Sequence, residues 1–285
     1  MNVHPETKNN INTKVVDNFS TLKSYLFFFP VFLLSTIFLF LYSQNTLSVA
    51  HYIAVQKDWF YYINAHYSQF PNTIYNLTQI GDALIFLSLL SVLLLKAPKL
   101  WEALLSASIV SAIFSNVFKN LFAVPRPAAY FNTKSFTIIG QTLTGHNSLP
   151  SGHSITVFTI LTVLLFSFMP KKILSKILWT IFIISVGLLI VFTRVGLGAH
   201  FPLDVITGSC LGGISGLAGI FITRNYKVWS WIGNKKFFPV FIILFLVCGI
   251  IIINKIRLEN LVIFYFSLIN LIVSLYQITY AYIKK

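Results

Sequence analysis

Charged residues are scarce in this sequence, and acidic ones most of all. Only 10% of the 285 residues are charged, with seven Asp and Glu against 21 Lys and Arg. A soluble globular chain carries roughly 25% charged residues. Hydrophobic residues make up 56% of the chain, and the mean hydropathy is +0.78. Most of the surface therefore does not meet water, which excludes an ordinary soluble protein and indicates a membrane protein.

Cysteine is nearly absent, and a cleavable leader is not expected. Cys210 and Cys248 both lie in apolar runs, where Cys behaves as a small hydrophobic residue, and no metal-binding C-x-x-C spacing occurs. Residues 1–23 are too long and polar for the start of a signal peptide, and the apolar run after them is long enough to span a bilayer. We therefore expect residues 1–23 to form a poorly ordered polar tail before an uncleaved first helix.

Apolar runs fill most of the remaining chain and predict the fold class. They lie at about 25–43, 76–95, 101–122, 154–169, 177–193, 203–222, 237–254 and 260–282. Each is close to the roughly 20 residues that a spanning helix needs. We expect an all-α fold, a polytopic membrane helix bundle of about eight transmembrane helices, with no separable soluble domain. The polar and aromatic stretch between the first two runs contains residues 59–62, which we interpret as an interfacial anchor.

The distribution of basic residues predicts the topology. Eight spans place both termini on one side, and 14 of the 21 Lys and Arg fall on that side: Lys8, Lys14, Lys23, Lys96, Lys99, Lys171, Lys172, Lys176, Arg224, Lys227, Lys235, Lys236, Lys284 and Lys285. Because basic loops stay in the cytoplasm, both termini are expected there. The basic residues that give the net charge of +14 are scattered between the apolar runs and form no continuous stripe. Nucleic acid is therefore not an expected partner.

Three short segments at the opposite, outward side carry chemically useful residues. Lys119 ends the third apolar run and Arg126 follows it, Ser151, Gly152 and His153 close a long loop, and Arg194, His200 and Asp204 precede and open the sixth run. Charges at helix ends in a membrane are costly unless paired, so they indicate a functional site. Three cations that meet there need an anion between them, and a phosphate meets this need.

The same segments also predict the division of chemical roles. Ser151 and Gly152 lie just before a helix start, where free N–H groups and the helix dipole favour anions. Asp204 stands four residues after His200, so its carboxylate can fix the imidazole tautomer and leave the other nitrogen free to attack. This favours His200 as nucleophile and leaves His153 to protonate the leaving group. Asp82 is expected to cap a helix, His51 and His66 to be interfacial anchors, and His146 to be either a loop residue or a substrate contact.

The motifs together resemble a known family. Lys119-x6-Arg126-Pro127, Pro150-Ser151-Gly152-His153 and Thr193-Arg194-x5-His200-x3-Asp204 are similar, in order and spacing, to the three signatures of the type-2 phosphatidic acid phosphatase superfamily. The family also includes soluble vanadium haloperoxidases, which the hydropathy excludes here. Two departures are Thr193, where the family usually has Ser, and the length, because the common bacterial members have six spans.

The resemblance implies a function and a division of the chain. Lys119, Arg126, Ser151, Gly152 and Arg194 would bind phosphate, His200 would form a phosphohistidine oriented by Asp204, and His153 would protonate the leaving alcohol, with no metal or other cofactor. Residues 24–223 would form a six-helix phosphatase-like core with active-site loops at 119–153 and 193–204. Residues 224–285 would add a C-terminal transmembrane hairpin.

The expected activity is that of a lipid phosphatase at the outer face of a bacterial cytoplasmic membrane. Undecaprenyl diphosphate, phosphatidylglycerol phosphate, phosphatidate and the phosphates of lipid A all remain open as substrates. A lipid phosphotransferase with the same site is an alternative, because the motifs do not specify the acceptor. A transporter or a catalytically silent lipid-binding protein is the third, because charged residues near helix ends also mark transport paths.

Overall fold

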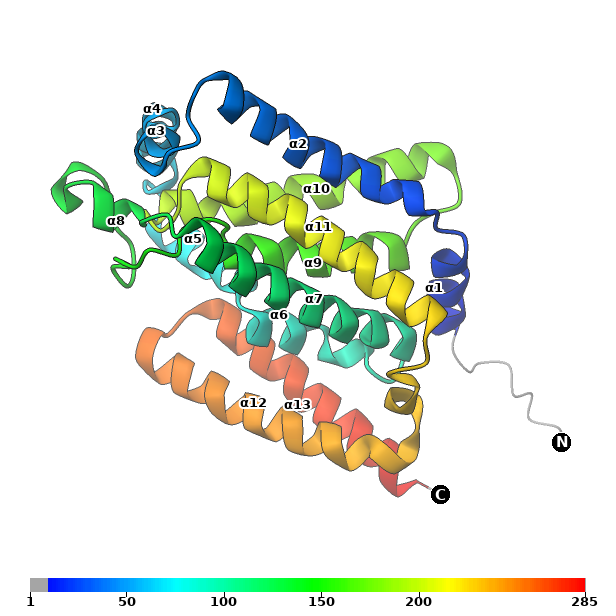
Figure 1. Ribbon diagram of the computed structural model, residues 1–285. Helices are drawn as coiled ribbons and strands as arrows, with labels where there is room; N and C mark the ends of the chain where they lie inside the picture. The colour runs from blue at the N-terminus through cyan, green and yellow to red at the C-terminus, as the bar shows by residue number, and fades with distance from the viewer. Residues whose placement is uncertain (1–9, 285) are drawn as a thin grey trace, which may run out of the picture.

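The computed structural model describes residues 10–284, and every regular element in this range is a helix. Figure 1 shows the long helices side by side in one bundle. The helices are α1 (Asn10–Ser20), α2 (Phe28–Ser43), α3 (Val49–Ala54), α4 (Lys57–Tyr67), α5 (Pro71–Thr78), α6 (Ala83–Leu90), α7 (Pro98–Phe122), α8 (Pro127–Tyr130), α9 (Gly152–Ser167), α10 (Ile173–Gly196), α11 (Pro202–Asn225), α12 (Phe238–Glu259) and α13 (Val262–Ile283). Short 3₁₀ turns join several of them. The all-α expectation is confirmed.

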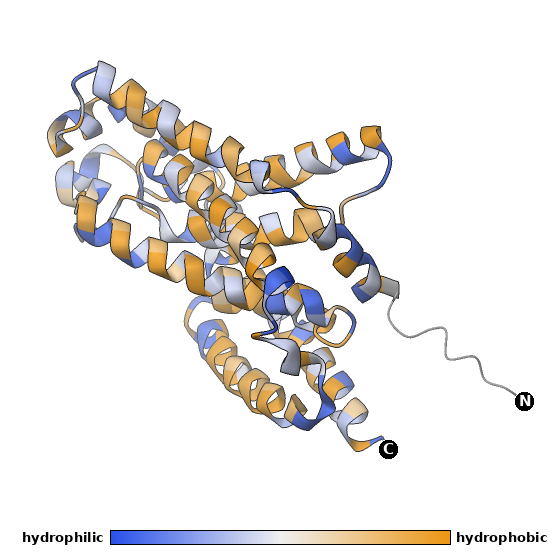
Figure 2. Ribbon diagram, turned by 45° about the vertical axis from the view of Figure 1, so that its right-hand side comes forward, coloured by the Kyte–Doolittle hydropathy of each residue, from blue (hydrophilic) through white to orange (hydrophobic). Residues whose placement is uncertain are grey.

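Within residues 10–284, six helical segments are long and apolar enough to cross a membrane. They are Ser24–Ser43, Pro98–Tyr130, Ile173–Gly196, Pro202–Asn225, Lys235–Glu259 and Val262–Ile283. The fourth expected span corresponds to α9, which is apolar but shorter, at 16 residues. In Figure 2 the long helices are mostly orange, and the connecting segments are largely blue or white. The chain is therefore a multi-pass membrane protein.

The second expected span, 76–95, is a bent segment of two apolar helices that are together long enough to count as one broken span. The chain forms α5, the 3₁₀ turn Gln79–Gly81, α6 and a further 3₁₀ turn, with a bend of 80° between Pro71–Gly81 and Ala83–Leu93. The bend follows from Gly81 and Asp82. The carboxylate of Asp82 accepts the N–H of Leu84 at 2.9 Å and begins a new helix, as expected of an N-cap. Gly81 packs against the ring of His153, where a Cβ would lie 2.7 Å from the ring.

Helix α11 is the centre of the bundle and packs most closely on α9 and α7. In its most apolar stretch of 18 residues, 61% are buried, the largest fraction among the candidate spans. Gly208 and Gly212 lie one turn apart on the face towards α9, and a Cβ at Gly208 would lie 2.6 Å from the carbonyl oxygen of Ser151. Small residues at this spacing let membrane helices approach closely. The close contact fixes the start of α9, and hence Ser151, against α11.

The helix ends divide the molecule into two opposite faces. In Figure 1, α1 and the end of α13 lie at the right, whereas α3, α4 and α8 lie at the left. Residues 10–20 of the expected polar tail form α1, which buries Val15 and Phe19, so the expectation of disorder is wrong for this part. The first nine residues of that tail, including Lys8, and Lys285 lie outside the described residues. The amphipathic pattern of α1 explains its helix, because its apolar side meets the ends of α7 and α9.

Helices α12 and α13 pack on each other and on α6. Lys255 Nζ lies 3.1 Å from the carboxylate of Asp82, and the hydroxyl of Tyr75 donates to Glu259 at 3.0 Å. The hairpin therefore contacts the bent segment α5–α6 through polar groups at the same end of the molecule as α8. These contacts support the bent segment whose Gly81 packs against His153 of the second motif.

Candidate active site

His200 lies in the tight turn between α10 and α11 and is almost fully buried, with 1% of its surface exposed. The carbonyl of Arg194 accepts the N–H groups of Ala199 and His200 at 3.0 and 3.3 Å, which closes the turn over the end of α10. Phe201 follows and is fully buried against the rings of Phe60 and Phe131. This anchoring fixes the direction in which the imidazole points.

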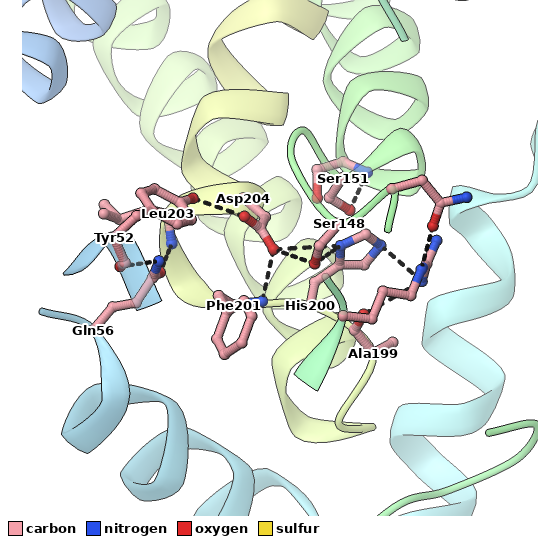
Figure 3. Close-up of polar contacts among 12 residues, drawn as sticks. Tyr52, Gln56, Ser148, Ser151, Ala199, His200, Phe201, Leu203 and Asp204 are labelled. Atoms are coloured by element: carbon pink, nitrogen blue, oxygen red, sulfur yellow. Dashed lines mark hydrogen bonds and ion pairs between the residues drawn. The ribbon is translucent and has the colours of Figure 1, made fainter. Parts of the chain in front are cut away.

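Asp204 stands beside His200 and is held by three hydrogen-bond donors. Tyr52 Oη donates to Oδ1 at 2.7 Å, Ser148 Oγ donates to Oδ2 at 2.6 Å, and the N–H of Phe201 donates to Oδ2 at 2.9 Å. Figure 3 shows these donors around the carboxylate. A carboxylate that accepts several hydrogen bonds is stabilised as an anion despite its burial.

Ser148 also links Asp204 to the imidazole. Oδ2 of Asp204 lies 3.6 Å from Nδ1 of His200, which is too long for a hydrogen bond. The hydroxyl of Ser148 lies 3.4 Å from the same nitrogen, between the two side chains. His200 and Asp204 are therefore close together, but the hydroxyl of Ser148 lies between them in place of a direct hydrogen bond. Nδ1 faces the Ser148–Asp204 side, and Nε2 faces away from it.

Arg126 lies on the Nε2 side of His200. Its Nη1 is 3.4 Å from Nε2 and 3.3 Å from the carbonyl oxygen of Ala199, while its Nε donates to Asn147 at 2.7 Å. Arg126 is 9% exposed, so the guanidinium is held in one position by partners on the loop and on the turn. The planar fork is therefore preorganised next to the nitrogen that is free to react.

Arg194 and Lys119 supply the other two cations. Arg194 donates from Nη1 to Thr78 Oγ1 at 3.2 Å, and its buried Nε has no hydrogen-bond partner within residues 10–284. Lys119 ends α7 with Nζ only 3.1 Å from the position that a Cβ of Gly152 would take. The motif glycine thus gives the ammonium group room beside the start of α9. A buried guanidinium N–H and an ammonium group are left to bind an anion.

The start of α9 completes the cluster. Ser151 caps α9, and its own N–H donates to the backbone oxygen of Asp204 at 3.0 Å. The close packing of α11 therefore engages that N–H, so it is not available for phosphate. His153 is in the first turn, and Arg194, His200, Lys119 and Arg126 are its strongest electrostatic neighbours. Thr193 is buried, and its hydroxyl bonds to the carbonyl of Ile190 in its own helix.

The electrostatic environment keeps His200 neutral. Burial lowers the pKa of His200 well below its ordinary value, and the positive charges of Arg126, Arg194 and Lys119 lower it further. The opposite shift occurs at Tyr52 in α3, where burial and the neighbouring Asp204 raise the pKa of the phenol well above its ordinary value. Tyr52 therefore stays a hydrogen-bond donor, and His200 keeps an unprotonated ring nitrogen.

Several residues of this site were not identified from the sequence. Tyr52 and Gln56 lie in the stretch that reads as interfacial, yet Gln56 accepts the N–H of Leu203 at 2.9 Å and donates to the carbonyl of Tyr52 at 2.9 Å. No local pattern marks them, because Asp204 and Leu203, which they contact, are about 150 positions away. Ser148 and Asn147 lie just before the second motif, and that proximity was the available signal. His146, which precedes Asn147, is exposed.

Comparisons with known proteins show what this chain is similar to. Residues 100–229 match the family model of the PAP2 superfamily. An undecaprenyl-diphosphatase from Sulfolobus acidocaldarius is 30% identical over 139 residues, which are 48% of this chain and 62% of that protein. The chain thus matches under two thirds of the length of that relative. The crystal structure of Aquifex aeolicus LpxE is 26% identical, with a TM-score of 0.48, over 60% of this chain and 96% of that one.

Proposed function

Because residues 100–229 match the family model of the PAP2 superfamily, we propose that the chain is a membrane lipid phosphatase of that family and that it acts through a phosphohistidine at His200. One observation carries the proposal. The guanidinium of Arg126 lies 3.4 Å from Nε2 of His200, while the opposite edge of the ring faces Ser148 and Asp204. A phosphoryl group bound to Arg126 would therefore have its phosphorus next to an unprotonated nitrogen.

The first step transfers the phosphoryl group to the enzyme. Nε2 of His200 attacks phosphorus, the N–P bond forms, and the bond from phosphorus to the leaving oxygen breaks. His153 gives its proton to that oxygen, so the lipid leaves as an alcohol, or as a lipid monophosphate from a diphosphate. Arg126, Arg194 and Lys119 surround the equatorial oxygens, whose negative charge is more concentrated in the transition state.

The second step returns the enzyme to its starting state. His153, now without its proton, takes one from water, and the resulting hydroxide attacks phosphorus. The N–P bond breaks, inorganic phosphate leaves, and Nε2 of His200 regains its lone pair. Asp204 stabilises the positive charge that the phosphorylated imidazole carries, through Ser148 and its own carboxylate.

The substrate of the proposed reaction is a phosphomonoester or diphosphate of a lipid. Undecaprenyl diphosphate, phosphatidylglycerol phosphate, phosphatidate and lipid A all present such a group at a membrane surface. We place both termini in the cytoplasm and the site at the outer face of a bacterial cytoplasmic membrane. The 14 basic residues on the terminal side support this orientation.

Release of inorganic phosphate by the purified protein from these four lipids tests the proposal. His200→Ala is expected to lower kcat by at least about 10³-fold, because the nucleophile is lost. His66→Ala is the matched control, since His66 is exposed on α4 and bonds only to the carbonyl of Tyr62. Activity that survives in the His200→Ala protein would exclude the nucleophile assignment.

The same assay addresses a phosphotransferase with this site. A phosphohistidine can pass its phosphoryl group to a second lipid instead of water, and Arg126, Arg194 and Lys119 would serve either acceptor. Free phosphate formed in proportion to the lipid consumed favours hydrolysis. Consumption without free phosphate, and with a new phosphorylated lipid, would favour transfer.

A further inference from the structure

A cavity of about 420 Å³ adjoins the active site on the side of His153. It lies between the start of α6, the middle of α7 and the first turns of α9, and its lining includes both Gly152 and His153. One face of α7 contributes residues spaced three or four apart, and one face of α9 does the same. The facing sides of α7 and α9 therefore form two walls of the cavity.

The cavity wall is rich in uncharged hydrogen-bonding groups. They are Ser108, Ser111, Ser115 and Asn116 on α7, with Thr156 and Thr159 on α9. Thr159 is 1% exposed, and its hydroxyl has no hydrogen-bond partner among the described residues. A buried polar group without a partner is uncommon in native proteins and indicates a ligand or solvent contact.

The charges around the cavity also limit what it can hold. Asp82 is the one charged residue in its lining other than the titratable His153, and the Asp82 carboxylate pairs with Lys255 at 3.1 Å. The three cations of the site are not part of this lining. A second phosphate would therefore meet a carboxylate and hydroxyls instead of a guanidinium. An uncharged group with several hydroxyls fits better, because Ser, Thr and Asn side chains both donate and accept hydrogen bonds.

We propose that this cavity binds the leaving group of the substrate, and that the leaving group is a glycerol or a sugar with free hydroxyls. This inference rests on the proposed function, in which His153 protonates the leaving oxygen and so places the leaving group on its own side. Ser111 and Thr156 face the cavity from opposite helices and bind the hydroxyls of the leaving group, with Ser111 as an acceptor because its own hydroxyl donates to the carbonyl of Ser108 at 2.9 Å. Phosphatidylglycerol phosphate and lipid A have such hydroxyls, whereas the diacylglycerol of phosphatidate has none beyond the one that forms.

Specificity measurements with purified protein test this inference. We expect kcat/KM for phosphatidylglycerol phosphate or for lipid A to exceed that for phosphatidate and for undecaprenyl diphosphate by at least about tenfold. A preference for phosphatidylglycerol phosphate assigns a glycerol leaving group, and a preference for lipid A assigns a sugar. Equal or higher values for phosphatidate or undecaprenyl diphosphate would overturn the inference while leaving the phosphatase function intact.

A double variant locates the preference in the cavity. Ser111→Ala with Thr156→Val removes two hydroxyls at nearly constant volume, and we expect the ratio of kcat/KM for the preferred lipid over phosphatidate to fall about tenfold. Ser215→Ala is the control, because Ser215 is buried in α11 and bonds to the carbonyl of Leu211. An unchanged ratio in the double variant would contradict the inference. If the wild-type protein releases phosphate from none of the four lipids, the proposed function fails and the inference fails with it.

Discussion

At the scale of single residues, the hydrogen bond from Ser148 to Asp204 has the clearest functional consequence. Ser148→Ala removes the hydroxyl that donates to the buried carboxylate of Asp204 at 2.6 Å. The carboxylate retains its hydrogen bonds from Tyr52 and from the N–H of Phe201. We expect kcat to fall about 10- to 100-fold, because loss of one such bond to a buried charge costs about 1.5–3 kcal/mol. KM should change little, since Ser148 does not face the phosphate side.

Steady-state kinetics of the Ser148→Ala protein check this prediction, with Ser209→Ala as the control. Ser209 is also buried, but its hydroxyl bonds to the carbonyl of Val205 within α11. Equal losses in both variants would show a general packing effect. A normal kcat for Ser148→Ala would exclude Ser148 as a positioning residue.

The protonation state of His200 predicts the acid side of the pH profile. Burial and the facing cations Arg126, Arg194 and Lys119 lower the pKa of His200 well below about 6.5, while Asp204 is the facing anion. Only the unprotonated ring attacks, so activity is lost as pH falls through this lowered pKa. We therefore expect kcat/KM to remain high below pH 6.5. A fall in kcat/KM centred at or above pH 6.5 that reports His200 would contradict this account.

At the scale of elements, Asn64 in α4 connects the long loop to the end of α10. Its side chain donates to the carbonyls of Thr137 and Gly196 at 2.9 Å and of Val195 at 3.2 Å, and it accepts the N–H of Thr137 at 2.9 Å. Asn64 is 2% exposed, so these backbone groups have no water to replace it. The loop that contains Arg126 thereby keeps its place over the turn that contains His200.

Asn64→Leu is expected to destabilise the protein by about 3 kcal/mol, because it leaves several buried backbone groups unpaired. The thermal midpoint in detergent should fall by about 6 °C or more. Asn270→Leu is the matched control, since Asn270 donates only to the carbonyl of Phe266 in its own helix. An equal midpoint for the Asn64→Leu and wild-type proteins would refute the role of this contact.

The elements also show what the sequence can and cannot predict. Seven apolar runs match helices of the structure within a few residues, because hydropathy measures what a helix must bury or expose to lipid. The run at 76–95 corresponds to two helices joined at a bend, and hydropathy does not register the break at Gly81 and Asp82. Of the site, the motif residues are found in sequence, whereas Tyr52, Gln56 and Asn64 are not. Their roles depend on partners far along the chain, which no local pattern contains.

At the scale of the whole molecule, the separation of the active-site loops from the basic end of the bundle predicts which side of the membrane the site faces. The active-site loops lie at the end opposite α1 and the end of α13 (Figure 1). In a background of Cys210→Ala and Cys248→Ala, a cysteine at the exposed Thr142 should react with an impermeant thiol reagent from outside intact cells. Lys171→Cys, between α9 and α10 at the other end, should react only after lysis. The reverse pattern would invert the orientation.

The central claim is that His200 becomes phosphorylated during turnover, and trapping this species tests it most directly. Purified protein is mixed with a radiolabelled lipid phosphate, quenched in alkali within one turnover, digested and analysed by mass spectrometry. The account predicts an acid-labile phosphoryl group on the peptide that contains His200, and no label in the His200→Ala protein. Phosphate release with no labelled peptide at any quench time, or a label on a different residue, would contradict it.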